Sequence, residues 1–208
     1  MASLPDLLTL LRRREPLAAS ALCRELEVSR ATLSRLVGAA GEEVVRLGHA
    51  RATRYARTRL VEGVGRSAPL HRIGHDGVAR SAGRLVFLWG GATWLEAEGD
   101  GRLFTGLPPA LVDMAPQGYL GHGFASRFPE LALPPRVSDW SEDHRLRALA
   151  LRGEDTVGDL ILGRESLDRF LRWSLTDVEP ATFPALAERA SLDVAGSSAG
   201  GELSLIHI

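Results

Sequence analysis

The feature that most constrains the fold is a run of three short amphipathic helices predicted within the first 40 residues. Four leucines recur at the i, i+3, i+4, i+7 spacing that gathers side chains on one helix face, namely Leu4, Leu7, Leu8 and Leu11. Ser3 is placed to cap this helix and Pro16 to end the segment. Residues 18–26 and 30–39 predict two further helices, the last one capped by Ser29.

The second and third predicted helices form a recognisable motif. Residues 20–36 have the sequence S-A-L-C-R-E-L-E-V-S-R-A-T-L-S-R-L, which resembles the helix-turn-helix of bacterial transcription regulators. Val28 supplies the apolar residue of the turn. The segment departs from the motif at Glu27, where many regulators have glycine, and this departure concerns the geometry of the turn.

A hairpin is predicted directly after the third helix. Residues 43–47 and 53–57 are strand-like and are joined by G-H-A-R-A, with Arg51 near the tip. A hairpin in this position is typical of a wing. We therefore expect residues 1–60 to form a winged helix-turn-helix.

The charge of this segment indicates DNA as its partner. Residues 1–60 contain eleven arginines and six acidic residues, a net charge of +5, whereas the rest of the chain carries −6. The third helix would enter the major groove, and the hairpin arginines would add salt-sensitive contacts to phosphates. The predicted DNA contacts are Ser29, Arg30, Thr32, Ser34, Arg35, Arg51 and Arg54, and Arg57 and Arg59 continue the spacing along the hairpin. The alternative is a protein–protein docking domain that has lost DNA binding.

Residues 61–192 predict an α+β body. Short strand-like runs separated by glycine-containing turns cover residues 67–77, 84–90, 93–98 and 102–105, which predicts an antiparallel meander, and an apolar strand follows at 158–163. Helices are expected to start near Pro109, to run from a cap at Asp139 or Ser141, and to span 165–173.

Several pairs invite a catalytic or metal-binding interpretation that their placement does not favour. His71 and His75 lie on a strand and turn without a third ligand nearby. Asp143 and His144 are adjacent on a helix and point apart, which favours capping and surface roles. The single cysteine, Cys23, is expected to be a small core residue, because one cysteine excludes an internal disulfide. We identify no catalytic or metal-binding residue in this chain.

The middle and the end of the chain resemble the HipA family, the serine/threonine kinase toxins of bacterial type II toxin–antitoxin systems. The motifs are L-P-P-A-L-V-D-M-A-P-Q-G-Y-L-G at 107–121, D-W-S-E-D at 139–143, R-G-E-D-T-V-G-D-L-I-L-G at 152–163 and V-A-G-S-S-A-G-G-E at 194–202. Within that family the chain looks most like the YjjJ-type members, which carry their own helix-turn-helix.

This resemblance implies a HipA-type N-terminal subdomain over 61–192 and the start of a glycine-rich ATP loop over 193–202. It assigns ATP binding to Gly196, Ser197, Ser198, Gly200 and Gly201, and makes Ser197 and Ser198 candidate autophosphorylation sites. The family uses ATP and Mg²⁺, a protein substrate and an antitoxin partner. Its phosphate-binding lysine and its catalytic asparagine have no counterpart, because the sequence contains no lysine and no asparagine. Residues 203–208, L-S-L-I-H-I, look like translated adapter sequence and are expected to be a non-native tail.

Two functions follow as expectations. The first is the N-terminal fragment of a HipA-like kinase toxin with a built-in DNA-binding domain, lacking the kinase C-lobe, inactive as a kinase and needing no cofactor itself. The second is a winged-helix transcriptional regulator whose C-terminal domain binds a ligand or a partner. Neither a signal peptide nor an apolar run near the roughly 20 residues that cross a bilayer is present, so we expect a cytoplasmic protein without a membrane partner.

Overall fold

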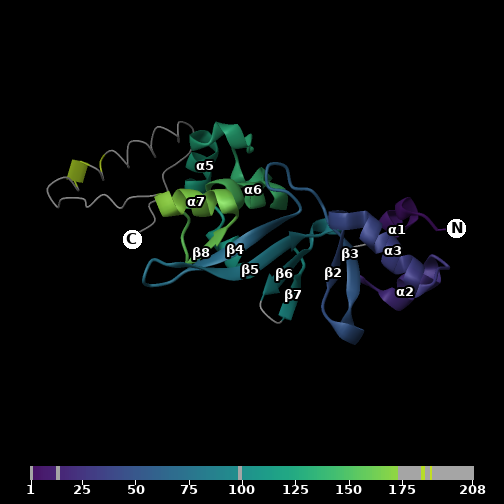
Figure 1. The fold of residues 1–208 in the computed structure, drawn as a ribbon. Helices are drawn as coiled ribbons and strands as arrows, with labels where there is room; N and C mark the ends of the chain where they lie inside the picture. The colour runs from purple at the N-terminus through teal and green to yellow at the C-terminus, as the bar shows by residue number, and fades with distance from the viewer. Residues whose placement is uncertain (1, 13–14, 98–99, 173–183, 186–187, 189–208) are drawn as a thin grey trace.

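The structure, a computed structural model, describes residues 2–12, 15–97, 100–172, 184–185 and 188. These residues form a mixed α+β fold with two antiparallel sheets (Figure 1). The N-terminal elements are α1 (Leu4–Leu10), β1 (Leu17–Ala18), α2 (Ala19–Glu25), α3 (Arg30–Ala40), β2 (Val44–Leu47) and β3 (Arg54–Arg57). The body contains β4 (Ser67–Ile73), β5 (Ala79–Phe87), β6 (Thr93–Ala97), β7 (Asp100–Phe104), α4 (Pro109–Met114), α5 (Gly118–Arg127), α6 (Glu142–Arg152), β8 (Leu160–Leu162) and α7 (Arg164–Arg172).

The N-terminal unit packs three helices against a small sheet. Leu7, Leu22 and Leu33, one from each helix, are at most 2% exposed and meet in a single core. The sheet has the order β1-β3-β2, and all its pairs are antiparallel. The three helices and the two hairpin strands agree with the sequence prediction. The two-residue strand β1 was not predicted, because it is too short to show an alternation.

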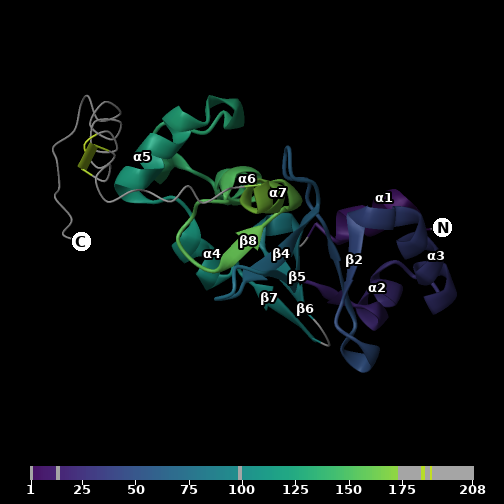
Figure 2. The ribbon, with the colours of Figure 1, turned by 60° about the vertical axis from the view of Figure 1, so that its left-hand side comes forward.

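The body is a five-stranded antiparallel sheet with helices on one face (Figure 2). Its strand order is β7-β6-β5-β4-β8, so the predicted meander is confirmed and β8 adds to the β4 edge from far along the chain. Leu85 and Phe87 of β5 are buried in one core with Leu111 of α4 and with Leu146 and Leu149 of α6. Two predictions were incomplete: β5 begins at residue 79 instead of 84, and α5 was not expected.

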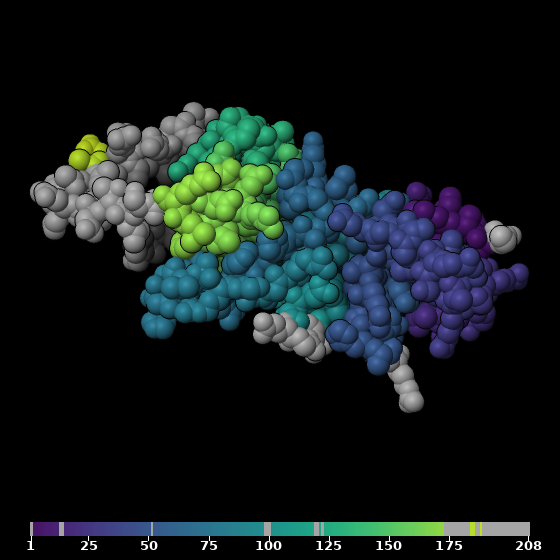
Figure 3. All heavy atoms as spheres, in the orientation of Figure 1, coloured from purple at the N-terminus to yellow at the C-terminus, as the bar shows by residue number. Residues whose placement is uncertain are grey.

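The opposite face of the body sheet carries the hairpin β2–β3. Leu47 and Ala56 of the hairpin are buried with Val86 and Leu88 of the body in a separate apolar cluster. In the space-filling view the blue hairpin lies directly against the teal strands (Figure 3). Because Val44 packs into the helical core on the other side, the hairpin is a layer shared by the two units.

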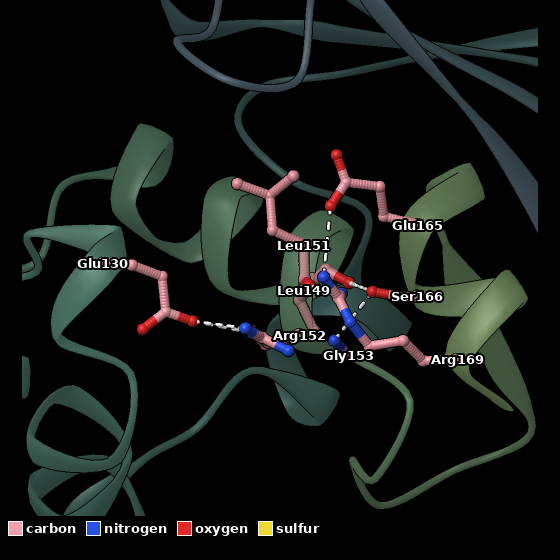
Figure 4. Close-up of polar contacts among 8 residues, drawn as sticks. All are labelled: Glu130, Leu149, Leu151, Arg152, Gly153, Glu165, Ser166 and Arg169. Carbon is pink, nitrogen blue, oxygen red and sulfur yellow. Dashed lines mark hydrogen bonds and ion pairs between the residues drawn. The ribbon is translucent and has the colours of Figure 1, made fainter. Parts of the chain in front are cut away.

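Helix α7 is fixed to the end of α6 by side-chain hydrogen bonds (Figure 4). The hydroxyl of Ser166, which is fully buried, donates to the Leu149 carbonyl at 3.0 Å and accepts from the Gly153 N–H at 2.8 Å. Arg169 donates to the carbonyl of Leu151. The last carbonyls of a helix have no partner inside the helix. These contacts satisfy two of them, those of Leu149 and Leu151, and the cluster therefore has a structural role.

Candidate nucleic-acid interface

Two backbone hydrogen bonds close the turn between α2 and α3. The N–H of Val28 donates to the Cys23 carbonyl at 3.0 Å, and the N–H of Glu27 donates to the Arg24 carbonyl at 3.3 Å. These two bonds form a Schellman motif, which places one residue in the left-handed region, usually glycine. Glu27 is that residue, with φ of 53°. The sequence departure at this position therefore leaves the turn intact, at the cost of a backbone conformation that glycine adopts more easily.

Helix α3 presents a polar face outward. Leu33 is 2% exposed and Leu36 is partly buried, both in the helical core. Arg30, Ser34 and Arg35 lie exposed on the other side. The apolar and polar sides of α3 are therefore separated, and three of the predicted contacts, Arg30, Ser34 and Arg35, are open to a partner.

The remaining predicted residues of α3 form a hydrogen-bonded group. Ser29 caps the helix, and its hydroxyl oxygen accepts from the Thr32 N–H at 3.1 Å. The hydroxyl of Thr32, a half-buried residue, lies 3.1 Å from that of Ser29 and accepts from a guanidinium nitrogen of Arg35 at 3.3 Å. The side chain of Thr32 is thus engaged within the helix.

The hairpin offers fewer open arginines than its sequence suggested. Arg54 is exposed and donates to the Pro16 carbonyl at 3.4 Å. The side chain of Arg51 lies outside the described residues. Arg57 and Arg59, which continue the spacing along the strand, are turned into the molecule.

Arg57 makes contacts on both sides of the unit boundary. It pairs with Glu43 at 3.2 Å, and its guanidinium stacks 5.1 Å from the ring centroid of Trp89, a body residue. Arg12 stacks on the same ring at 5.4 Å. These arginines join the N-terminal unit to the body.

Arg59 makes the second connection. Its guanidinium donates to the Leu88 carbonyl at 3.1 Å and pairs with Asp143 in the first turn of α6. Burial lowers the pKa of Arg59, and the charge of Glu142 opposes that shift. An arginine pKa starts so high that the group stays charged at neutral pH. The carboxylate of Asp143 balances the charge of Arg59 inside the protein, so Arg59 is not available for a phosphate backbone.

The structure exposes five arginines of the N-terminal unit without an ion pair among the described residues, and the sequence had predicted only three of them as DNA contacts. Five exposed arginines of the N-terminal unit form neither an ion pair nor an aromatic contact within the part of the chain that the structure describes. They are Arg24, Arg30, Arg35, Arg46 and Arg54. Arg24 and Arg46 were not among the predicted contacts, because helix and strand spacing alone does not show which arginines lack a carboxylate.

His144 of the Asp143–His144 pair caps α6 together with Ser141. The N–H of Ser141 donates to Nδ1 of His144 at 3.0 Å, and the N–H of His144 donates to the Ser141 hydroxyl at 3.3 Å. Burial, followed by the nearby charge of Arg147, lowers the pKa of His144. The expectation of a capping role is confirmed for His144, whereas Asp143 in the first turn pairs with Arg59. No group of three or more His, Cys, Asp or Glu side chains that could hold a metal occurs within the described residues.

A groove of about 550 Å³ separates β2 from the body sheet. Its charged lining includes Arg46, Arg66, Arg84 and Glu96. Arg84 pairs with Glu96 at 2.7 Å across the neighbouring strands β5 and β6. Arg84 is therefore neutralised in the groove, whereas Arg46 and Arg66 form no ion pair within the described residues.

The predicted ATP-loop residues, Gly196, Ser197, Ser198, Gly200 and Gly201, lie outside the described residues. Of the helices that are described, none is long and apolar enough to cross a membrane.

Comparison with known proteins places the middle of the chain in a described family. Residues 64–171 match the family described as "YjjJ-like toxin, middle domain". The chain is 34% identical over 215 residues to the protein named "Toxin YjjJ" from Escherichia coli (strain K12). That similarity covers 97% of this chain and 46% of the relative, so the chain spans about half the length of the relative. No solved structure matches the chain.

Proposed function

The chain belongs to the YjjJ-like toxin family, and on that premise we propose that it is the N-terminal part of a HipA-like serine/threonine kinase toxin with its own DNA-binding unit. Residues 1–60 would form the winged helix-turn-helix, residues 61–192 the HipA-type N-terminal subdomain, and residues 193–202 the start of the ATP loop. DNA binding is the activity that this chain itself would carry.

The exposed polar face of α3 is the observation that carries DNA binding. It stands on a helix whose apolar side is buried, directly after a satisfied turn, with Arg30, Ser34 and Arg35 pointing outward. Arginine donates two parallel hydrogen bonds to guanine in the major groove, and this is the commonest specific contact of recognition helices. The unpaired arginines of the same unit would contact phosphates.

The described residues do not fit ATP and magnesium. They contain no lysine to hold phosphates and no group of three or more metal-ligating side chains. We therefore assign no phosphotransfer step to residues 2–172. ATP, Mg²⁺, a protein substrate and an antitoxin partner are proposed for the longer kinase, with its ATP loop beginning at Gly196, Ser197, Ser198, Gly200 and Gly201.

DNA binding is tested by fluorescence anisotropy with a duplex covering the chain's own promoter. We expect salt-dependent binding that Arg35→Ala weakens about fivefold or more, because a good bidentate contact contributes about 1–3 kcal/mol. Arg136→Ala, an exposed arginine of the body, is the matched control and should bind like the parent chain. Absence of binding at low salt would identify the unit as a protein-docking module.

The kinase assignment has a separate test. The purified 208-residue chain, incubated with radiolabelled ATP and Mg²⁺, should incorporate no phosphate. Labelling of Ser197 or Ser198 would contradict this expectation. An intact gene copy whose frame continues past codon 202 with a lysine and an Asp…Asn catalytic loop would support the kinase, and a nearby stop codon in several intact genomes would count against it.

The groove between β2 and the body sheet favours a second candidate, a transcriptional regulator whose body binds a ligand. Its volume of about 550 Å³ lies in the range of small-molecule sites, and such sites often lie between units. A ligand that shifted NMR signals of Arg46 and Arg66 and changed promoter affinity would support this function. An intact gene that encodes the kinase residues would argue against it.

A further inference from the structure

The hydrogen bonds of Thr32 give this residue a different role from the other polar residues of α3. Arg30, Ser34 and Arg35 are exposed, whereas Thr32 is half-buried. Both polar groups of Thr32 already have partners in the helix: its N–H donates to the Ser29 oxygen at 3.1 Å, and its hydroxyl lies between Ser29 and Arg35. A hydroxyl has one proton and two lone pairs, so Thr32 retains little capacity to contact a base itself.

The donor inventory fixes the direction of the bond between Arg35 and Thr32. A guanidinium can only donate, so Arg35 donates an N–H to the Thr32 oxygen across 3.3 Å. The hydroxyls of Thr32 and Ser29 lie 3.1 Å apart, and either of them can donate to the other. The Ser29 oxygen also accepts from the N–H of Thr32. The three side chains thus form a hydrogen-bonded chain between Arg35 and the helix cap.

As a result, the guanidinium of Arg35 is held through one of its terminal nitrogens. One terminal nitrogen of Arg35 is tied to Thr32, and the remaining N–H groups stay open on the exposed side of α3. Arg30, on the same helix, has no such bond within the described residues. A side chain held in its binding conformation loses less entropy on binding, and a fixed orientation gives the two-pronged guanidinium geometric selectivity.

We propose that Thr32 is a positioning residue that sets Arg35 for a bidentate contact with one guanine, and that Arg30 makes the sequence-neutral contacts. This inference rests on the proposed DNA-binding function and adds to it the base that is recognised and the residue that aligns the contact. Thr32 acts through Arg35 and does not touch the base.

The test is a binding selection from duplexes randomised over 20 base pairs, using the full 208-residue chain and five proteins: the parent, Arg35→Ala, Thr32→Ala, Thr32→Ser and Arg30→Ala. The parent should enrich one guanine that Arg35→Ala no longer enriches. Thr32→Ala should lose at least fivefold of that enrichment, and a larger factor than it loses in affinity for a duplex of random sequence. Thr32→Ser keeps the hydroxyl and should restore the preference. Arg30→Ala should keep the preference and bind all duplexes more weakly.

The outcomes separate this proposal from the proposed function. If Thr32→Ala keeps the full guanine preference of the parent, or if Thr32→Ser fails to restore it while circular dichroism shows the same helix content, Thr32 does not position Arg35. If the parent enriches a site without an Arg35-dependent guanine, DNA binding stands and the guanine assignment is wrong. If the parent binds no duplex at low salt, the proposed function itself fails.

Discussion

The N-terminal unit and the body differ in how often an arginine is paired with an acid. Five exposed arginines of the N-terminal unit form neither an ion pair nor an aromatic contact within the described residues. In the body, six arginines are paired with acids, in Arg72–Asp159, Arg80–Asp76, Arg84–Glu96, Arg147–Glu62, Arg152–Glu130 and Arg169–Glu165. Other arginines of the body, such as Arg136 and Arg164, are exposed and form no ion pair within the described residues. The body therefore pairs a larger share of its arginines with acids than the N-terminal unit does.

This difference shows that net charge is an incomplete guide to a nucleic-acid surface. The excess of +5 in residues 1–60 includes Arg57 and Arg59, which are held by Glu43, Trp89, Leu88 and Asp143. Those two arginines connect the units. A phosphate contact requires a guanidinium that is exposed and lacks an acid nearby, and only part of the basic segment meets both conditions.

The largest expected effect is on stability, at the junction between the two regions. Arg59→Ala should lower the free energy of unfolding by about 2–3 kcal/mol, because it leaves the Leu88 carbonyl and the Asp143 carboxylate without their partner. Urea unfolding followed by circular dichroism measures the change. Arg84→Ala, which removes an exposed ion pair, is the control and should cost less than about 1 kcal/mol. A loss of promoter affinity without loss of stability would show that Arg59 belongs to the DNA surface.

The open arginines should give a smaller effect, and on DNA binding alone. Arg30→Ala and Arg54→Ala should each reduce the slope of log K against log salt by about one unit. Neither should change the free energy of unfolding by more than about 0.5 kcal/mol, because their side chains are exposed. Anisotropy titrations at several salt concentrations give the slope. An unchanged slope in both variants, with the parent binding normally, would remove the contrast between the two regions.

The turn of the N-terminal unit should respond to a glycine. Glu27→Gly should raise the free energy of unfolding by roughly 0.5–1 kcal/mol, since φ at this position is 53° and glycine tolerates that conformation without strain. Ala132→Gly, at a φ of 47° in the body, is the matched comparison and should gain a similar amount. A destabilised Glu27→Gly variant would mean that the glutamate side chain contributes more than its backbone strain costs.

The smallest effect concerns an exposed pair of the body. The Arg80 hydrogen bond, helped by the Val78 N–H, lowers the pKa of Asp76 to about 2. Any stabilisation from this pair is present above the ordinary pKa of 3.8 and is lost as the pH falls through about 2. Arg80→Ala should move the pKa of Asp76 back toward 3.8 in an NMR carboxyl titration, with no measurable change in stability at neutral pH. An unchanged pKa would show that the backbone N–H alone holds the carboxylate.

Local signals predicted most of the secondary structure. The spacing of leucines and the serine caps predicted α2, α3 and α6 within about two residues and the start of α1, because a helix cap and a buried face both depend on residues close together in the sequence. Helix α1 ends at Leu10, earlier than the expected end before Pro16. The elements that were missed have weak local signals: β1 has two residues, and α5 contains several glycines, which favour other conformations in isolation. Its packing against Trp140 and the loop before α6 stabilises it instead.

The candidate site also contains features that local sequence signals predict and features that only the structure reveals. Of the four residues of α3 that were predicted to contact DNA, Arg30, Ser34 and Arg35 are exposed, as helical periodicity indicates, whereas Thr32 is half-buried. The bond between Thr32 and Arg35 depends on side-chain conformations. The contacts that hold Arg57 and Arg59 against the body are made by Trp89, Leu88 and Asp143, all more than 25 positions away along the chain. Spacing within one strand cannot report partners at that distance.

By itself, the sequence determined most of the helices, the hairpin, the meander and the presence of a basic N-terminal segment, because periodicity, caps and charge are local properties. Only the tertiary structure decided that the hairpin lies between two apolar cores, that Trp89 and Asp143 hold two of its arginines, and that the remaining arginines stay open. The physical reason is that burial and ion pairing join residues far apart in the chain. Whether an arginine faces solvent or a carboxylate is settled only when those residues meet.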